Sequence, residues 1–191
     1  MRIFFAVCFA LLTSSAFAST SGFIHGLSHP ISGIDHILAM VAVGIFAANL
    51  GGRAIWAVPL TFISLMGVGG VLGISGVPVP FVELGIAFSI IVLGLAIGVQ
   101  CDWPVAAAMT LVGVFAIFHG HAHGTETPVD AAGAEYAAGL VIATGLLHLI
   151  GIGIGLGIAR AAMTMANGRR ITQIGGGVIA VLGVGVLMGI V

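Results

Sequence analysis

Residues 54–99 read AIWAVPLTFISLMGVGGVLGI, SGVPVPF and VELGIAFSIIVLGLAIGV: two long apolar runs joined by a short Gly/Pro segment. Each run is close to the ~20 residues that an α-helix needs to cross a bilayer. The Gly/Pro segment cannot continue a helix, so it separates the two runs. The stretch therefore predicts two transmembrane helices, Ala54–Ile74 and Val82–Val99, with a turn between them.

The rest of the chain has the same composition. Of its 191 residues, 60% are hydrophobic and 6% are charged, and none is lysine. A soluble domain usually carries about 25% charged residues, so the composition argues against a soluble fold. The net charge of −1 argues against a nucleic-acid partner. We therefore expect an all-α polytopic membrane protein whose surroundings are a lipid bilayer.

The N-terminus has the pattern of a secretory signal. Arg2 precedes a short apolar core, and Ala16-Phe17-Ala18 places small residues at the positions read by signal peptidase. The alternative is an uncleaved first transmembrane helix, for which the apolar core is short. We predict a signal peptide at residues 1–18 and a single six-helix transmembrane domain at 19–191.

Arginine placement orients the predicted helices. The six spans are Ile31–Leu50, Ala54–Ile74, Val82–Val99, Val105–Phe118, Glu135–Ile158 and Ile171–Val191. Cleavage of a signal leaves the mature N-terminus outside, so the joints after the first, third and fifth spans face the cytoplasm. These joints hold every arginine of the mature chain: Arg53, Arg160, Arg169 and Arg170. This agrees with the positive-inside rule and predicts a bacterial inner-membrane protein with both mature termini in the periplasm.

The histidines and carboxylates gather at the opposite, periplasmic face. One group precedes or begins the first span and the other follows the fourth; the groups are His25, His29, Asp35 and His36, and His119, His121, His123 and Glu126. Ionisable side chains are expensive in lipid and usually mark a functional site. Their convergence from distant parts of the chain predicts a shared site.

The first group has helical spacing. His29 and His36 are seven residues apart and Met40 is four beyond, which places all three on one face of a single helix. Asp35 lies about 100° round the helix, where it binds the same ion or orients an imidazole. Imidazoles combined with carboxylates suit nickel, cobalt, zinc or copper. Histidine must be neutral to bind a metal, so affinity should weaken as the pH falls toward about 6.

The second group has two interpretations. His119, His123 and Glu126 are spaced four and three apart, and so share a face if the fourth span extends through them. Alternatively, residues 119–126 form a solvated, histidine-rich loop. His148, near the middle of the fifth span, is either an interhelical hydrogen-bonding residue or a deeper position on an ion path.

At these residues the chain resembles the HupE/UreJ family of nickel permeases. The matching stretches are His29-Pro30-x-x-Gly33-x-Asp35-His36-x-x-Ala39-Met40-x-x-Val43-Gly44, Phe118-His119-Gly120-x-Ala122-His123-Gly124-x-Glu126-x-Pro128 and Ala143-Thr144-x-x-Leu147-His148. The resemblance covers the whole chain and implies metal uptake that supplies hydrogenase or urease, with cobalt moved by some relatives. It also implies functional roles for His29, Asp35, His36 and Glu126, whereas His121 falls at a variable position.

We therefore predict a secondary permease, not an enzyme, that imports Ni²⁺ or Co²⁺ from the periplasm to the cytoplasm. The ion is the transported substrate and not a prosthetic group. The expected metal-binding residues are His29, Asp35, His36, His119, His123 and Glu126, with His25, Met40, His121 and His148 as further candidates. No nucleotide-binding motif is present, so ATP coupling would require another subunit. The sequence leaves homo-oligomer formation open.

Other functions remain as alternatives. Gly73-Ile74-Ser75-Gly76 matches the short Gly-x-Ser-Gly of rhomboid intramembrane proteases, with His148 as the base. A zinc hydrolase is disfavoured because His-Glu-x-x-His is missing from the sequence. A passive metal-binding protein would not need six spans. A cobalt transporter linked to cobalamin synthesis stays open, because nickel and cobalt accept the same nitrogen and oxygen ligands.

Overall fold

A computed structural model of the chain describes residues 22–100, 102–127, 133–164 and 168–191. The predicted signal peptide lies outside these residues. A short helix, Gly22–Ser32, precedes α2 (Ile34–Leu50), α3 (Ala54–Ile74), α4 (Val82–Val99), α5 (Val105–Thr125), α6 (Gly133–Thr164) and α7 (Gly168–Leu187). Every regular element in the described ranges is a helix, which confirms the predicted all-α class.

Most of these helices have the length and composition of membrane spans. Among the described residues, α3 to α7 each contain such a segment, and the short helix with α2 makes a sixth if the bent pair is counted as one span. The prediction of a polytopic membrane protein is therefore confirmed. The first span is a broken one, with an angle of 82° between its two helices.

The predicted helix boundaries hold best in the middle of the chain. Both α3 and α4 begin and end at the predicted residues. Phe81 and Gln100, in the left-handed conformation at φ 59° and 55°, bracket α4 and stop it at both ends. By contrast, α5 continues seven residues past Phe118, which was the predicted end of the fourth span. Gly189, at φ 66°, lies beyond the end of α7.

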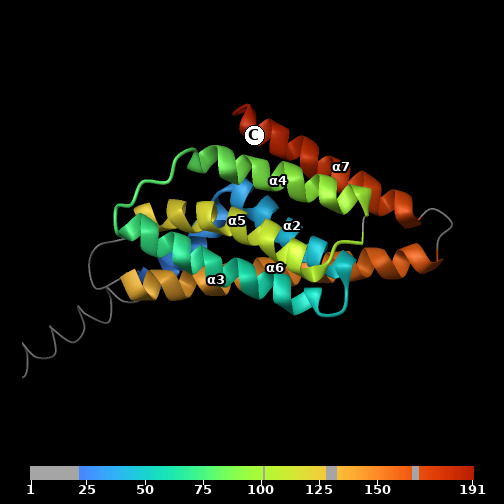
Figure 1. Ribbon diagram of the computed structural model, residues 1–191, viewed down its shortest axis with the longest axis horizontal. Helices are drawn as coiled ribbons and strands as arrows, with labels where there is room; N and C mark the ends of the chain where they lie inside the picture. The colour runs from blue at the N-terminus through green and yellow to red at the C-terminus, as the bar shows by residue number, and fades with distance from the viewer. Residues whose placement is uncertain (1–21, 101, 128–132, 165–167) are drawn as a thin grey trace, which may run out of the picture.

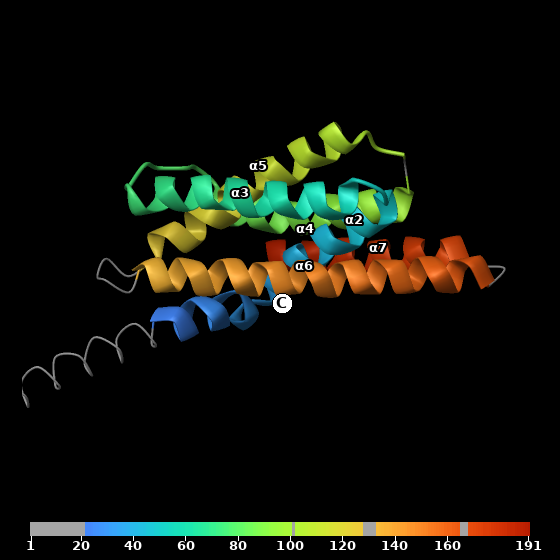
Figure 2. The same ribbon diagram turned by 90° about the horizontal axis from the view of Figure 1, so that it is seen from below.

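The helices form a bundle around α2 (Figures 1 and 2). In this bundle α3 packs on α5, α4 on α7 and α2 on α6. Nearly all of α2 from Ala39 to Ala48 is buried. Gly44 lies directly against the α6 backbone at His148 and Gly151. Such close approach of small residues is how helices associate in lipid, where the hydrophobic effect does not drive helices together.

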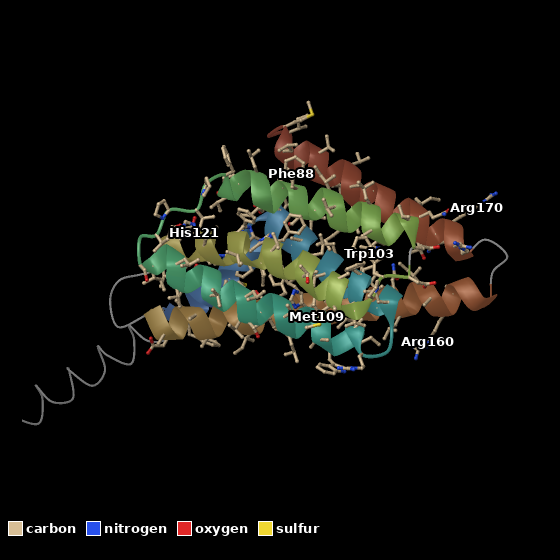
Figure 3. All side chains as sticks on the ribbon, viewed as in Figure 1. Phe88, Trp103, Met109, His121, Arg160 and Arg170 are labelled. Carbon is tan, nitrogen blue, oxygen red and sulfur yellow. The ribbon has the colours of Figure 1, made fainter. Side chains whose placement is uncertain are left out.

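The two ends of the bundle differ in chemistry. Figure 3 shows Arg160 and Arg170 at one end and His121 toward the other. At the arginine end, a cavity of about 260 Å³ lies among α2, α4, α6 and α7. Asn49, Gln100 and Arg169 contribute to its lining, and Arg169 Nε donates a hydrogen bond to Gln100 Oε1 at 3.3 Å.

Candidate metal centre

The first predicted span is not one continuous helix. His29 belongs to the short helix Gly22–Ser32, whereas His36 and Met40 belong to α2, on the other side of the 82° bend. The prediction that these three residues share one helix face is therefore wrong. The bend nevertheless brings the imidazoles near one another, with the ring centroids of His29 and His36 6.4 Å apart. Pro30 lies near the C-terminal end of the short helix, before the bend.

Gly33 lies at the break between the two helices. Its backbone is extended, at φ −104° and ψ 125°, between two helices. A Cβ at this position would lie 2.5 Å from Asp35 Oδ1 and 3.2 Å from His36 Nδ1. The glycine therefore leaves space for the Asp35–His36 pair. Asp35 stands in the first turn of α2, where the helix dipole favours a negative charge.

Asp35 determines which nitrogen of His36 is available. Asp35 Oδ1 lies 2.9 Å from His36 Nδ1. An ionised carboxylate only accepts hydrogen bonds, so in a neutral His36 ring Nδ1–H donates and Nε2 keeps its lone pair. Nε2 is buried and has no hydrogen-bond partner in the described part of the protein. Of the two roles expected for Asp35, orientation of an imidazole is the one that this contact supports.

The second group of residues is helical and buried. Residues His119–Thr125 form the last turns of α5, and His119, His121 and His123 are each at most 8% exposed. The alternative of a solvated loop beginning at residue 119 is therefore wrong. Gly120 and Gly124 lie against the α3 backbone at Met66 and Gly70, so α5 can extend here in close contact with α3.

Three side chains already have the spacing of a metal site. Ligand atoms of His29, His123 and Glu126 all lie within 4.8 Å of one another. Ligands at about 2.1 Å on opposite sides of one ion are about 4.2 Å apart, so a small adjustment would let these three share an ion. His29 Nε2 lies 2.7 Å from Glu126 Oε2. We refer to these three residues as the outer triad.

The outer triad continues inward through His123. The ring of His36 lies 4.7 Å from that of His123 and 5.3 Å from that of His119, measured between centroids. His119 Nδ1 and both nitrogens of His123 are buried and lack a hydrogen-bond partner within the described ranges. Buried polar atoms are normally paired, so nitrogens of this kind are consistent with metal ligation. The C-terminal end of α5, with its negative partial charge, also favours a cation here.

The remaining predicted residues lie around this cluster or apart from it. His25 is exposed, with its ring 5.9 Å from that of His29. His121 Nε2–H donates to the Val77 carbonyl, between α3 and α4, at 2.9 Å, and this nitrogen is therefore occupied. Met40 is fully buried in the apolar core. His148 is buried in α6, and neither of its ring nitrogens has a hydrogen-bond partner among the described residues.

Three residues at the cluster were not predicted. Tyr136 has its ring 5.3 Å from His25 and 5.9 Å from His29, and it is the only tyrosine in the chain. Ser89 lies 3.1 Å from His119 and carries the only hydroxyl group in α4. The sequence could have singled out Tyr136 and Ser89, because each is rare in its surroundings. Phe62, whose ring lies 5.5 Å from His119 and 5.2 Å from His148, is one of 11 phenylalanines and gave no signal.

The serine protease geometry is not formed. Ser75 is the exposed C-cap of α3. The ring of His148, in α6, contacts Phe62 of α3. Phe62 precedes Ser75 by 13 residues, which is about 20 Å along a helix that rises about 1.5 Å per residue. A nucleophile and its base must lie within hydrogen-bond distance, so these two residues do not make a catalytic pair.

Comparisons with known proteins identify the family of the chain. The sequence profile described as HupE / UreJ protein matches residues 3–186. The chain is 44% identical over 169 residues to Protein HupE from Rhizobium leguminosarum bv. viciae, covering 88% of this chain and 85% of that protein. No solved structure matches the chain. The chain is thus a multi-pass membrane protein that belongs to the HupE/UreJ family.

Proposed function

We propose that this protein is a secondary permease that imports Ni²⁺, with Co²⁺ as the alternative ion, for metalloenzyme maturation. The observation that carries the proposal is the gathering of four imidazoles and two carboxylates at one end of an apolar bundle. Ring centroids of successive histidines in this group are 4.7–5.3 Å apart. Polar groups are costly in a membrane, and a cluster of metal-ligand types is best explained by an ion.

The outer triad would receive the ion first. Glu126, which is exposed, offsets part of the positive charge, while His29 and His123 replace water molecules. His36 and His119 lie next along the cluster and would take the ion deeper. His148 follows beyond Phe62, and His25 stands at the exposed side. Exchange of water for imidazole in small steps lowers the free energy needed to bring a divalent ion into low dielectric.

Arginine placement supports inward transport across the bacterial inner membrane. The arginine end of the bundle would face the cytoplasm, and the histidine cluster would face the periplasm. An ion collected at the cluster would then be delivered at the end where Arg160 and Arg170 lie. Nickel delivered there would supply hydrogenase or urease.

Uptake of radioactive nickel by cells that express the chain tests this function. Asp35→Asn and His36→Ala should abolish accumulation while the amount of protein in the membrane stays normal, because each removes one half of the Asp35–His36 pair. Ser75→Ala is the control and should transport normally. Normal transport by both Asp35→Asn and His36→Ala would show that the cluster is not the transport site.

The ion is identified by competition in the same assay. Unlabelled Ni²⁺, Co²⁺, Zn²⁺ and Cu²⁺ are added in turn to cells that take up labelled nickel. The proposed nickel permease should be inhibited most strongly by Ni²⁺, with Co²⁺ next. Stronger inhibition by Co²⁺ than by Ni²⁺ would favour the cobalt alternative, and indifference to both would contradict the proposal.

A further inference from the structure

Ser89 is a buried hydroxyl in an otherwise apolar helix. It lies in the middle of α4 and its side chain is fully buried. Its Oγ donates a hydrogen bond to the Ile86 carbonyl, one turn back, at 2.6 Å. A serine hydroxyl has a single hydrogen, and a carbonyl only accepts. The hydrogen of Ser89 is therefore committed to Ile86.

The hydrogen bond to Ile86 determines which atom donates in the second contact of the Ser89 oxygen. Ser89 Oγ lies 3.1 Å from His119 Nε2. Because the hydroxyl hydrogen is already used, the oxygen accepts here, and His119 Nε2 carries the proton. In a neutral imidazole the other nitrogen then holds a lone pair. That nitrogen, His119 Nδ1, is buried and without a hydrogen-bond partner in the described chain.

The ring that carries this lone pair lies beside the rest of the cluster. The His119 ring is nearly perpendicular to that of His36, at 87°, with centroids 5.3 Å apart. Asp35 holds the proton of His36 on Nδ1 in the same manner. The buried imidazole of His119 and the half-buried imidazole of His36 thus each have one nitrogen occupied by an oxygen acceptor and one buried nitrogen without a partner in the described residues. Metal-bound histidines usually show this arrangement, in which an outer oxygen sets the tautomer.

We propose that Ser89 is a positioning residue that holds His119 as the Nε2–H tautomer and so presents Nδ1 to the transported ion. This inference rests on the proposed metal function and assigns the histidine of α5 nearest the membrane interior a defined ligand atom. Serines in membrane helices often bond only to the carbonyl one turn back. The additional contact with a buried histidine distinguishes Ser89 from such a residue.

The first test measures metal binding by the purified full-length protein in detergent. Ser89→Ala should weaken the affinity for Ni²⁺ by about 10- to 100-fold, the usual effect of removing an outer partner of a metal-binding histidine. Ser89→Thr, which keeps the oxygen and its back-bond, should recover most of that loss. Thr110→Ala is the matched control, because the Thr110 hydroxyl donates to the Ala106 carbonyl at 3.0 Å but lies exposed on α5. It should bind as the wild type does.

The second test determines the tautomer of His119 in metal-free protein. Nitrogen-15 NMR of histidine-labelled protein distinguishes the two neutral tautomers, and His119→Ala identifies the His119 signals by their loss. Wild-type protein should show His119 protonated on Nε2, and Ser89→Ala should shift the ring toward the other tautomer or a mixture. A loss of affinity through altered packing alone would leave this signature unchanged.

The outcomes separate this inference from the transport proposal. Weaker binding with a changed tautomer supports the role of Ser89. An unchanged tautomer in Ser89→Ala overturns it, whatever the affinity, as does wild-type affinity in that variant. Failure of wild-type protein to bind Ni²⁺ or Co²⁺ contradicts the proposed function, and with it the metal role of Ser89; the tautomer result then decides only whether the hydrogen bond exists.

Discussion

Gly33 links a break in the backbone to the chemistry of the metal centre. The residue between the two helices has no Cβ, and this leaves space for Asp35 and His36. Alanine is compatible with φ −104°, so backbone strain is not the issue at this position. A methyl group there acts on the Asp35 carboxylate, which must move away from 2.5 Å to an ordinary contact distance.

We therefore expect Gly33→Ala to impair transport without unfolding the protein. Displacement of Asp35 should loosen the hydrogen bond that orients His36 and weaken Ni²⁺ binding by about tenfold or more. Binding and membrane abundance are measured together. Gly67→Ala is the control, because a Cβ at Gly67 of α3 would have no atom within 4 Å. Equal nickel affinities for these two variants would show that the position of Asp35 is not critical.

Residue types were predictable from the sequence, but their hydrogen bonds were not. Asp35 and the seven histidines are conspicuous because charge is so scarce in this chain. The pairing of Ser89 with His119 joins residues 30 positions apart on different helices, and no local pattern encodes it. The hydrogen bond between His121 and the Val77 carbonyl likewise depends on how α3, α4 and α5 pack.

At the scale of the elements, the end of α5 matters most for the site. The predicted fourth span ended at Phe118, because three histidines within the next five residues resemble a polar loop. Neutral histidines can continue a buried helix when a partner helix covers them, and Gly120 and Gly124 allow α3 to do so. The break at Gly33 was missed because a single glycine does not by itself end a helix.

Gly120→Ala tests the contact between α3 and α5. The added Cβ would meet the Met66 carbonyl and push the two helices apart. We expect the free energy of unfolding to fall by about 1–3 kcal/mol, as for other overpacked positions, with a lower melting temperature in detergent. Gly153→Ala in α6, where a Cβ would have no atom within 4 Å, should change stability little. A stable Gly120→Ala protein would mean that the helices can separate here without penalty.

At the scale of the whole molecule, the presence of several membrane spans followed from composition. Apolar length gave the spans, and the boundaries of α3 and α4 were correct because Gly/Pro and polar joints flank them. The orientation in the cell stays a prediction. It is tested with single cysteines at Thr125 and Asn167 in a Cys101→Ser background, the second of which lies outside the described residues.

A membrane-impermeant thiol reagent applied from the periplasmic side should label Thr125→Cys and leave Asn167→Cys unlabelled. Thr125 is exposed at the histidine end of α5, so a negative result there would not reflect burial. Both cysteines should react once the membrane is permeabilised. The reverse pattern would place the arginines outside and would turn the proposed import into export.

The buried stretch of α2 has a consequence for the rate of transport. This helix begins at the metal centre and ends at Asn49 and Leu50, beside the cavity at the arginine end. Between them lie Met40, Val43 and Phe46, each at most 1% exposed and packed among the neighbouring helices. Side chains packed at interior density leave no water-filled path. An ion that moved along α2 would therefore require a shift of helices, typically in microseconds to milliseconds, which would limit turnover to that of a carrier.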